Sequence, residues 1–138
     1  MPALGRALAE RLQPGDVIAL SGDLGAGKTT LARAILAGLG HEGEVPSPTF
    51  TLVQTYEDLR LPVAHVDLYR LDLPEEADAL ALDDFLVDGV LLVEWPERLG
   101  RKIWPERLWL RLDGAGGTDR RLTWDCPRAW EGRWPPAL

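Results

Sequence analysis

The sequence predicts an α/β fold built on a mixed β-sheet, with a parallel core and antiparallel strands added to it. Short apolar runs, typical of buried strands, alternate with segments of helical periodicity over the first two thirds of the chain. A glycine-rich loop joins the first apolar run to a helical stretch. Two late strand-like segments flank another glycine-rich loop, which is typical of an antiparallel pair.

The first half of the chain is expected to begin with a helix over residues 3–12, where leucines recur every fourth residue and share one face. After a Pro-Gly-Asp turn, the apolar run Val17–Leu20 predicts a buried strand. A helix is expected from Lys28 to about Leu39, because glycines mark its end. Phe50–Tyr56 alternates apolar and polar residues and is therefore predicted to be a strand.

The second half is expected to hold two buried strands, a helix with proline in its first turn, and the late antiparallel pair. These elements are, in order, Val63–Val66 reaching Asp67, helix Pro74–Leu82, Val90–Val93 ending in Glu94, and the pair Leu108–Leu112 and Arg121–Trp124. Residues 127–138 are rich in proline and tryptophan and are predicted to form an irregular tail. The whole chain, residues 1–138, is expected to be a single domain.

Composition restricts the compartment and the class of partner. The single cysteine, Cys126, excludes an internal disulfide and any multi-cysteine metal site, so a reducing cytoplasm is expected. No apolar run approaches the roughly 20 residues needed to span a bilayer. Residues 1–97 hold 17 acidic and 6 basic residues, whereas residues 98–138 hold 5 acidic and 9 basic ones. Such an acidic chain is a poor solo binder of nucleic acid. Both charged regions are interpreted as solvated surface, with docking of a partner protein or a nucleic-acid-bearing complex on one of them as the alternative.

Residues 22–29 match the pattern G-x-x-x-x-G-K-S/T of a phosphate-binding P-loop. Glycine permits the positive φ angles that turn successive N–H groups toward one anion, and the following helix presents its positive end. The contacts are expected from Asp23, Leu24, Gly25, Ala26, Gly27, Lys28, Thr29 and Thr30. Among them, Lys28 is expected to reach the β- and γ-phosphates, and the Thr29 hydroxyl to bind Mg²⁺.

The P-loop match is specific for this composition. Lysine occurs only twice in the chain, and the residue frequencies give about one chance match in 1,000 over this length. The motif also lies between a predicted buried strand and a helix, as it must. The expected fold is therefore P-loop NTPase-like, with three layers and a mixed sheet, and the expected cofactors are a nucleoside triphosphate and Mg²⁺. No N-K-x-D motif of the GTPase type is present, which favours ATP.

A P-loop enzyme also needs a carboxylate for Mg²⁺ or its water. Asp67 and Glu94 both follow apolar strands, and ligands of parallel sheets bind at the carboxyl ends of strands, so both are candidates. Thr49, in the Ser-Pro-Thr loop, could sense the γ-phosphate as switch loops do, or make only local turn hydrogen bonds. His65 is interpreted as a core or supporting residue, and Trp95 as a packing or partner residue.

Four segments in this order, GDLGAGKTT, SPTFTLV, HVDLYRL and LVEWPERL, resemble those of the bacterial TsaE (YjeE) family over about residues 4–98. That family supplies the ATPase component of the machinery that makes N6-threonylcarbamoyladenosine at position 37 of tRNA. The resemblance implies ATP and Mg²⁺ as ligands. It also implies a complex with TsaD-like and TsaB-like proteins, which contacts tRNA indirectly. Family members usually have a further N-terminal segment before the first helix, and the C-terminal third of this chain carries little family signal.

The resemblance also implies roles for individual residues. Lys28 matches the phosphate-binding lysine and Thr29 the magnesium-binding hydroxyl. Asp67 matches the aspartate of the H-x-D-L-Y-R segment, Glu94 the glutamate of the V-E-W segment, and Thr49 the threonine of the S-P-T loop. The catalytic set implied is Lys28, Asp67, Glu94 and Thr49, and the metal ligands implied are Thr29, Glu94 and Asp67.

Two other functions fit the P-loop. A small-molecule kinase would need an acceptor pocket and usually a mobile lid, which the segment Asp72–Asp88 could supply by position. However, this segment has seven carboxylates and no basic residue, so it would repel phosphates. A nucleotide switch would gate assembly by ATP binding alone. If the chain is an ATPase, hydrolysis should be slow until a partner completes the site, with Arg70 as one cationic candidate within the chain.

Overall fold

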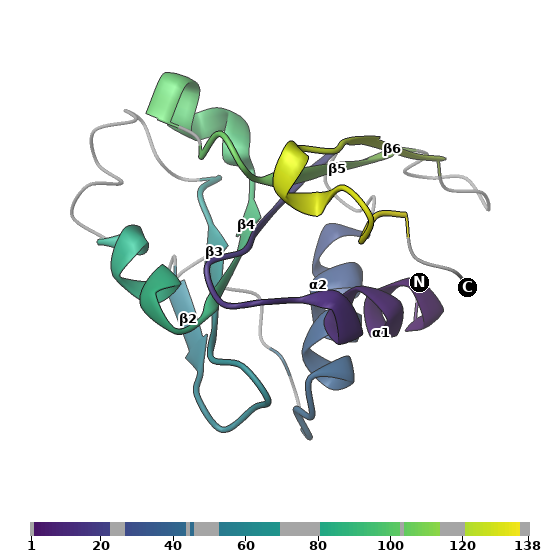
Figure 1. The fold of residues 1–138 in the computed structure, drawn as a ribbon, viewed down its shortest axis with the longest axis vertical. Helices are drawn as coiled ribbons and strands as arrows, with labels where there is room; N and C mark the ends of the chain where they lie inside the picture. The colour runs from purple at the N-terminus through teal and green to yellow at the C-terminus, as the bar shows by residue number, and fades with distance from the viewer. Residues whose placement is uncertain are drawn as a thin grey trace.

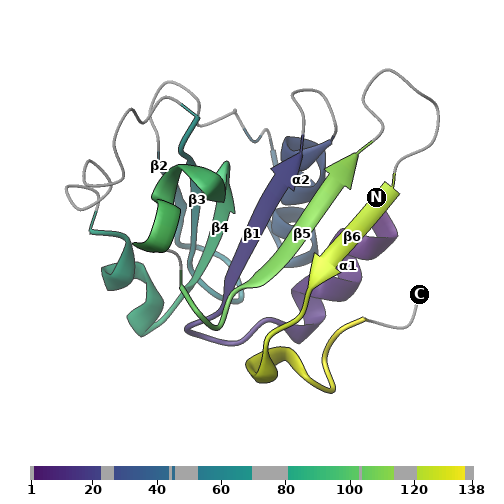
Figure 2. The ribbon, with the colours of Figure 1, turned by 90° about the horizontal axis from the view of Figure 1, so that it is seen from above.

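The computed structural model describes residues 2–22, 27–43, 45, 53–69, 81–102, 104–113 and 121–135. These residues form a six-stranded sheet in the order β2-β3-β4-β1-β5-β6 (Figure 2). The strands are β1 (Val17–Gly22), β2 (Val53–Tyr56), β3 (Val63–Asp67), β4 (Val90–Glu94), β5 (Leu108–Asp113) and β6 (Arg121–Asp125). The predicted α/β class is thus confirmed, and each predicted strand lies within a few residues of its expected position.

The sheet is mixed in the way the sequence predicts. The four central strands β3, β4, β1 and β5 run parallel to one another, whereas β2 and β6 pair antiparallel at the two edges. Parallel strands end at a common edge of the sheet. The end of β1 at Gly22 and the side chains of Asp67 and Glu94 therefore lie along the same edge.

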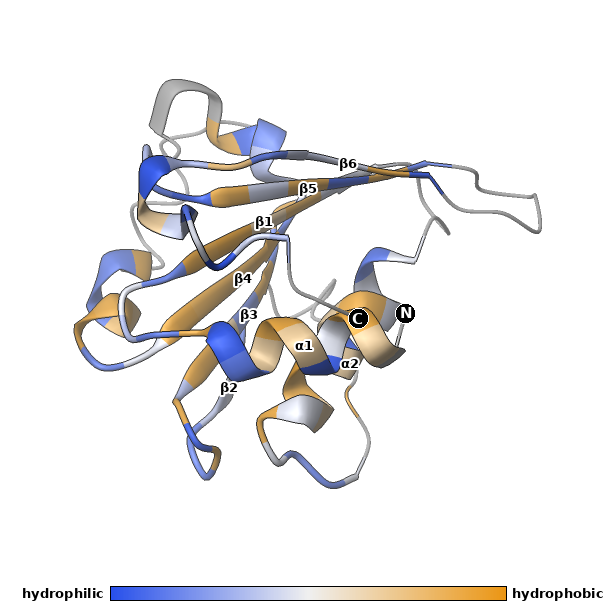
Figure 3. Ribbon diagram, turned by 45° about the vertical axis from the view of Figure 1, so that its right-hand side comes forward, coloured by the Kyte–Doolittle hydropathy of each residue, from blue (hydrophilic) through white to orange (hydrophobic). Residues whose placement is uncertain are grey.

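The two faces of the sheet are covered differently. Helices α1 (Pro2–Arg11) and α2 (Lys28–Gly38) pack side by side on one face (Figures 1 and 2). The 3₁₀ helices η2 (Leu82–Val87) and η3 (Pro96–Lys102) supply apolar side chains to the other face. Figure 3 shows that β4 and β1 between these layers are largely apolar, as expected for strands buried on both faces.

The 3₁₀ helix η2 differs from the sequence prediction, and η3 lies where no element was predicted. Most of the helix expected over Pro74–Leu82 lies outside the described residues. Within its last two residues, Ala81 adopts a left-handed conformation with φ of 49°, and Leu82 begins η2. The end of the predicted helix is therefore a turn leading into a 3₁₀ helix. Short 3₁₀ turns lack a periodicity long enough to be recognised in the sequence.

Residues 127–135 of the predicted irregular tail consist of turns and bends around one short helix, and they pack against the core. This segment contains the short 3₁₀ helix η4 (Arg128–Trp130) and is anchored to the core by the fully buried Trp130. The guanidinium of Arg133 lies 4.1 Å from the centre of the Trp130 ring and donates a 2.7 Å hydrogen bond to Asp16. Tryptophan side chains of this segment hold it against the core, because each can bury a large apolar surface.

Replacing Trp130 with alanine is expected to lower the free energy of unfolding by about 3–5 kcal/mol, since it leaves a large cavity in the core. Trp124→Ala is the matched control: Trp124 is 50% exposed, and its loss should cost clearly less. Urea denaturation of both variants measures the difference. Equal losses would show that the tail contributes no more to stability than a surface residue.

Candidate active site

The phosphate loop begins and ends with glycines that the backbone requires. At Gly22, with φ of +131°, a Cβ would lie 2.0 Å from the carbonyl oxygen of Leu112 on β5, so no other residue fits. Gly27 has φ of +107° and forms the N-terminal cap of α2, where its carbonyl accepts a 2.9 Å hydrogen bond from the Leu31 N–H. Residues 23–26, which complete the predicted phosphate contacts, lie outside the described residues.

The Lys28 side chain turns back toward the loop at the start of α2. Its residue surface is only 5% exposed, and its ammonium donates a hydrogen bond to the carbonyl oxygen of Gly22. Nζ also lies 3.9 Å from the centre of the Trp95 ring, which is a cation–π contact. The ammonium is thus held between the two ends of parallel strands, beside the loop predicted to bind phosphate.

Trp95 contacts the site more closely than the sequence interpretation allowed. It follows Glu94 directly and has φ of 59°, a left-handed conformation that is costly for an aromatic residue. The ring lies against Lys28 and also against Tyr69, at 4.9 Å between centres. Packing was one of the roles expected for Trp95. The structure adds that its ring packs against the Lys28 ammonium, which the sequence does not indicate.

Thr29 and Glu94 meet across adjacent strands. β4 lies next to β1, with Glu94 in register with Leu20, so its carboxylate reaches the first turn of α2. The Thr29 hydroxyl lies 3.1 Å from Oε1 and 3.2 Å from Oε2 of Glu94, which is 2% exposed. Two residues predicted separately as ligands of one cation are therefore in direct contact.

Asp67 ends the next strand along the sheet. It is in register with Glu94 and 5% exposed, and one of its carboxylate oxygens accepts a 2.9 Å hydrogen bond from the Tyr69 N–H. Because β3 is separated from β1 by β4, Asp67 lies one strand farther from the phosphate loop than Glu94. Both predicted carboxylates thus lie on the expected edge, but at different distances from the loop.

His65 connects to this group from within the sheet. It is fully buried, and its Nε2 lies 2.6 Å from Oε2 of Glu94. The side chain lies on the same face of β3 as Asp67, two residues away, as the alternation of a strand dictates. Its predicted burial is confirmed, whereas its hydrogen bond to Glu94 had no signal in the sequence beyond the two-residue spacing from Asp67.

Other predicted site residues remain untested by the geometry. Thr49 and Arg70 both lie outside the described residues. Thr30 is exposed on the first turn of α2. In the described part of the chain, no three His, Cys, Asp or Glu side chains gather as a metal site. A cation bound beside Thr29 would therefore take few ligands from the described residues.

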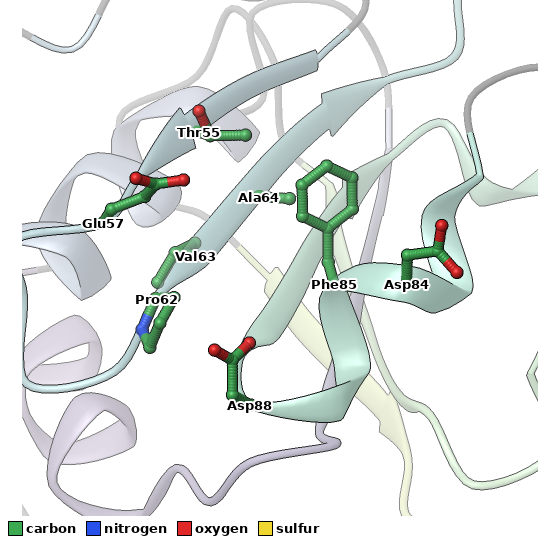
Figure 4. Close-up of a pocket in the computed structure, with 8 residues that line it drawn as sticks. All are labelled: Thr55, Glu57, Pro62, Val63, Ala64, Asp84, Phe85 and Asp88. Atoms are coloured by element: carbon green, nitrogen blue, oxygen red, sulfur yellow. The ribbon is translucent and has the colours of Figure 1, made fainter.

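A separate hollow of about 340 Å³ lies between the β2–β3 edge of the sheet and η2 (Figure 4). Phe85 points toward Ala64 on its floor, and the carboxylates of Glu57, Asp84 and Asp88 line its rim. Three carboxylates disfavour a phosphorylated ligand by charge repulsion. This hollow is therefore unsuited to accept a phosphorylated substrate of a kinase.

The surroundings of Cys126 disfavour a reactive thiol. Burial raises its pKa, the carboxylates of Glu131 and Asp125 raise it further, and Arg133 opposes them. A raised pKa leaves less of the nucleophilic thiolate at neutral pH.

In the described parts of the chain, no helix is both long enough and apolar enough to cross a membrane.

Comparisons with known proteins agree with this geometry. The family described as "Threonylcarbamoyl adenosine biosynthesis protein TsaE" matches residues 1–122. A Bacillus subtilis protein named tRNA threonylcarbamoyladenosine biosynthesis protein TsaE is 41% identical over 122 residues, covering 88% of this chain and 76% of that protein. Its namesake from Streptomyces coelicolor is 47% identical over 120 residues, covering 85% of this chain and 81% of its own.

The fold comparison leads to the same family. The crystal structure of Bacillus subtilis YdiB superposes with a TM-score of 0.77 at 34% identity, covering 96% of this chain and 82% of YdiB. The family match includes β1, α2, β3 and β4, which carry the phosphate loop and both carboxylates. The family match, the relatives and the fold together show that this chain belongs to the TsaE family.

Proposed function

We propose that this protein binds ATP with Mg²⁺ and hydrolyses it, as the ATPase component of threonylcarbamoyladenosine biosynthesis on tRNA. The observation that carries the proposal is the contact between Thr29 and Glu94. It joins the first turn after the phosphate loop to the end of the neighbouring strand. A P-loop NTPase uses such a hydroxyl and a strand-end carboxylate together at its cation.

The triphosphate would be bound mainly by the loop and Lys28. The backbone N–H groups of residues 23–27 are proposed to hold the phosphate oxygens, together with those of Lys28, Thr29 and Thr30 at the start of α2. The Lys28 ammonium would exchange its hydrogen bond to the Gly22 carbonyl for one to a phosphate oxygen. This exchange replaces a neutral acceptor by an anionic one, which forms the stronger hydrogen bond.

The residues present suit Mg²⁺. The Thr29 hydroxyl and the Glu94 carboxylate offer hard oxygen donors in contact with each other, with Asp67 on the next strand. When bound, Mg²⁺ would neutralise charge on the β- and γ-phosphate oxygens. Few protein ligands are needed, because Mg²⁺ in phosphate sites takes its remaining ligands from phosphate and water.

Hydrolysis requires an oriented water molecule near the γ-phosphate. Asp67, one strand farther from the loop than Glu94, is the residue we assign to accept a hydrogen bond from that water. Thr49 is assigned to the γ-phosphate, as the sensor of the nucleotide state. Glu94 would remain with Thr29 at the cation.

The proposed partners are TsaD-like and TsaB-like proteins, in a cytoplasmic complex that contacts tRNA. We assign the cationic group that stabilises the transition state to Arg70 or to a partner. If a partner supplies it, hydrolysis by the isolated chain should be slow.

The test is phosphate release from ATP by the purified chain, alone and with the TsaB-like and TsaD-like proteins of the same organism. We expect the rate to rise at least about tenfold when both partners are present. Lys28→Ala in the same mixture controls for ATPase activity of the partners. Equal rates with and without partners would contradict the composite site, and release that requires a small acceptor would indicate a kinase.

A further inference from the structure

We propose that His65 is a positioning residue that fixes the Glu94 carboxylate beneath the Thr29 hydroxyl. The inference rests on the proposed function, because it gives His65 a part in the cation site of that ATPase. It starts from the side chain's location. His65 is fully buried on β3, on the sheet face that carries α2, and is in register with Leu92, two residues before Glu94 on β4.

The direction of the hydrogen bond follows from the chemistry of the two groups. We assign the proton at the 2.6 Å contact between Nε2 of His65 and Oε2 of Glu94 to Nε2, because an ionised carboxylate only accepts hydrogen bonds. Both side chains are almost completely buried, at 0% and 3% exposed. In such surroundings a hydrogen bond to a charged acceptor is short and strong.

Among the described residues, the Glu94 carboxylate has two side-chain partners, Thr29 and His65. Thr29 faces both carboxylate oxygens at nearly equal distances, 3.1 and 3.2 Å. If the Thr29 hydroxyl oxygen turns to a cation, its hydrogen bond to Glu94 changes. The contact from His65 approaches Oε2 alone and comes from inside the sheet, so it can persist. His65 thus sets the carboxylate's orientation in either state.

A purely structural role explains His65 less well. Among the residues that the structure describes, its other ring nitrogen, Nδ1, is buried without a hydrogen-bond partner. Leaving a buried polar atom unpaired costs free energy that a leucine at this position would avoid. Residues that break a packing rule in this way are expected at functional sites, where another contact compensates. Here the compensating contact is the one that Nε2 makes with Glu94.

Three variants separate positioning from packing. His65→Leu removes both ring nitrogens and puts an apolar side chain of similar size in their place. His65→Gln returns an amide N–H donor near the place of Nε2. Val66→Ala is the matched control, because Val66 is the next residue on β3, fully buried, but faces the opposite side of the sheet. Thermal unfolding of each variant measures the packing effect separately.

The first measurement is ATP hydrolysis together with its Mg²⁺ dependence, in the partner complex. His65→Leu should lower kcat about 10–100-fold and raise the Mg²⁺ concentration at half-maximal rate, the usual effect of losing a hydrogen bond to a metal ligand. ATP affinity without Mg²⁺ should stay within about threefold, since the phosphate loop is untouched. His65→Gln should recover most of kcat, and Val66→Ala should lose stability but keep its Mg²⁺ dependence. Wild-type kcat and Mg²⁺ dependence in His65→Leu would overturn the proposal, as would a His65→Gln variant no better than His65→Leu.

The second measurement does not depend on hydrolysis. The chain has two histidines, so ¹⁵N spectra of the imidazoles are simple, and His65→Gln assigns the His65 signals. We expect Nε2 of His65 to be protonated in the folded wild-type protein at one fixed pH. An unprotonated Nε2 would overturn the proposal whatever the enzyme does. If the wild type fails to hydrolyse ATP, the proposed function fails. The role of His65 is then tested separately, by calorimetry of nucleotide binding with and without Mg²⁺ that compares His65→Leu with Val66→Ala.

Discussion

Lys28→Ala is expected to weaken ATP binding at least about 100-fold, a loss of about 3 kcal/mol. Among the described residues, the Lys28 ammonium is the side-chain cation that lies at the end of β1. There it donates a hydrogen bond to the carbonyl oxygen of Gly22. Its removal would leave the phosphate charge to the backbone N–H groups alone. Isothermal titration calorimetry with ATP and Mg²⁺ measures the loss directly.

The chain supplies its own control for this prediction. Lys102 is the only other lysine and lies in η3, outside the phosphate loop, so Lys102→Ala should bind ATP as the wild type does. Lys28→Arg should also bind poorly, because the planar guanidinium does not fit the compact site between the Gly22 carbonyl and the Trp95 ring. Unchanged affinity in Lys28→Ala would mean that the loop does not bind the triphosphate.

Much of the fold follows from the sequence because local pattern and tertiary role agree. Val17–Leu20 and Val90–Val93 are apolar throughout, and the structure buries both as central parallel strands. Leu108–Leu112 alternates, and its leucines face the α1–α2 core, whereas Trp109 and Arg111 face the other way. In each case the period of the sequence matches the surface that the strand must bury.

The failures have a common physical origin. The 3₁₀ helices η2 and η3 are held by tertiary contacts, such as that of Leu99 with the β3–β4 face, and lack a helical period of their own. The packing of the tail against the core had no signal in the sequence, because Trp130 is buried in a core assembled from α1 and the sheet, far from it along the chain. Local composition cannot show which surface a distant side chain will cover.

Some features of the site could likewise be predicted from the sequence, and others could not. Lys28, Thr29 and the strand-end position of both carboxylates could be predicted, because motif and strand ends are visible in sequence. The order β3-β4-β1 could not, and it is this order that places Glu94 against Thr29 and Asp67 one strand away. The contacts of His65 with Glu94 and of Trp95 with Lys28 also depend on that order.

Glu94→Gln is expected to reduce ATP hydrolysis at least about 100-fold while ATP affinity stays within a few-fold of the wild type. The substitution keeps the shape of a side chain that is 2% exposed and removes only its charge, so the fold should be preserved. Phosphate release in the partner complex measures the rate, and thermal unfolding checks the fold. Glu97→Gln, three residues away and exposed, should change neither.

The comparison with Asp67→Asn decides between the two carboxylates. Because Glu94 touches Thr29 and Asp67 lies one strand farther away, only Glu94→Gln should raise the Mg²⁺ concentration needed for hydrolysis. Asp67→Asn should lower kcat at saturating Mg²⁺, as expected of a residue that orients water. The opposite pattern would exchange the two roles. Hydrolysis within about threefold of the wild type in both variants would remove the strand-end carboxylates from the mechanism, since losing such a group typically costs far more.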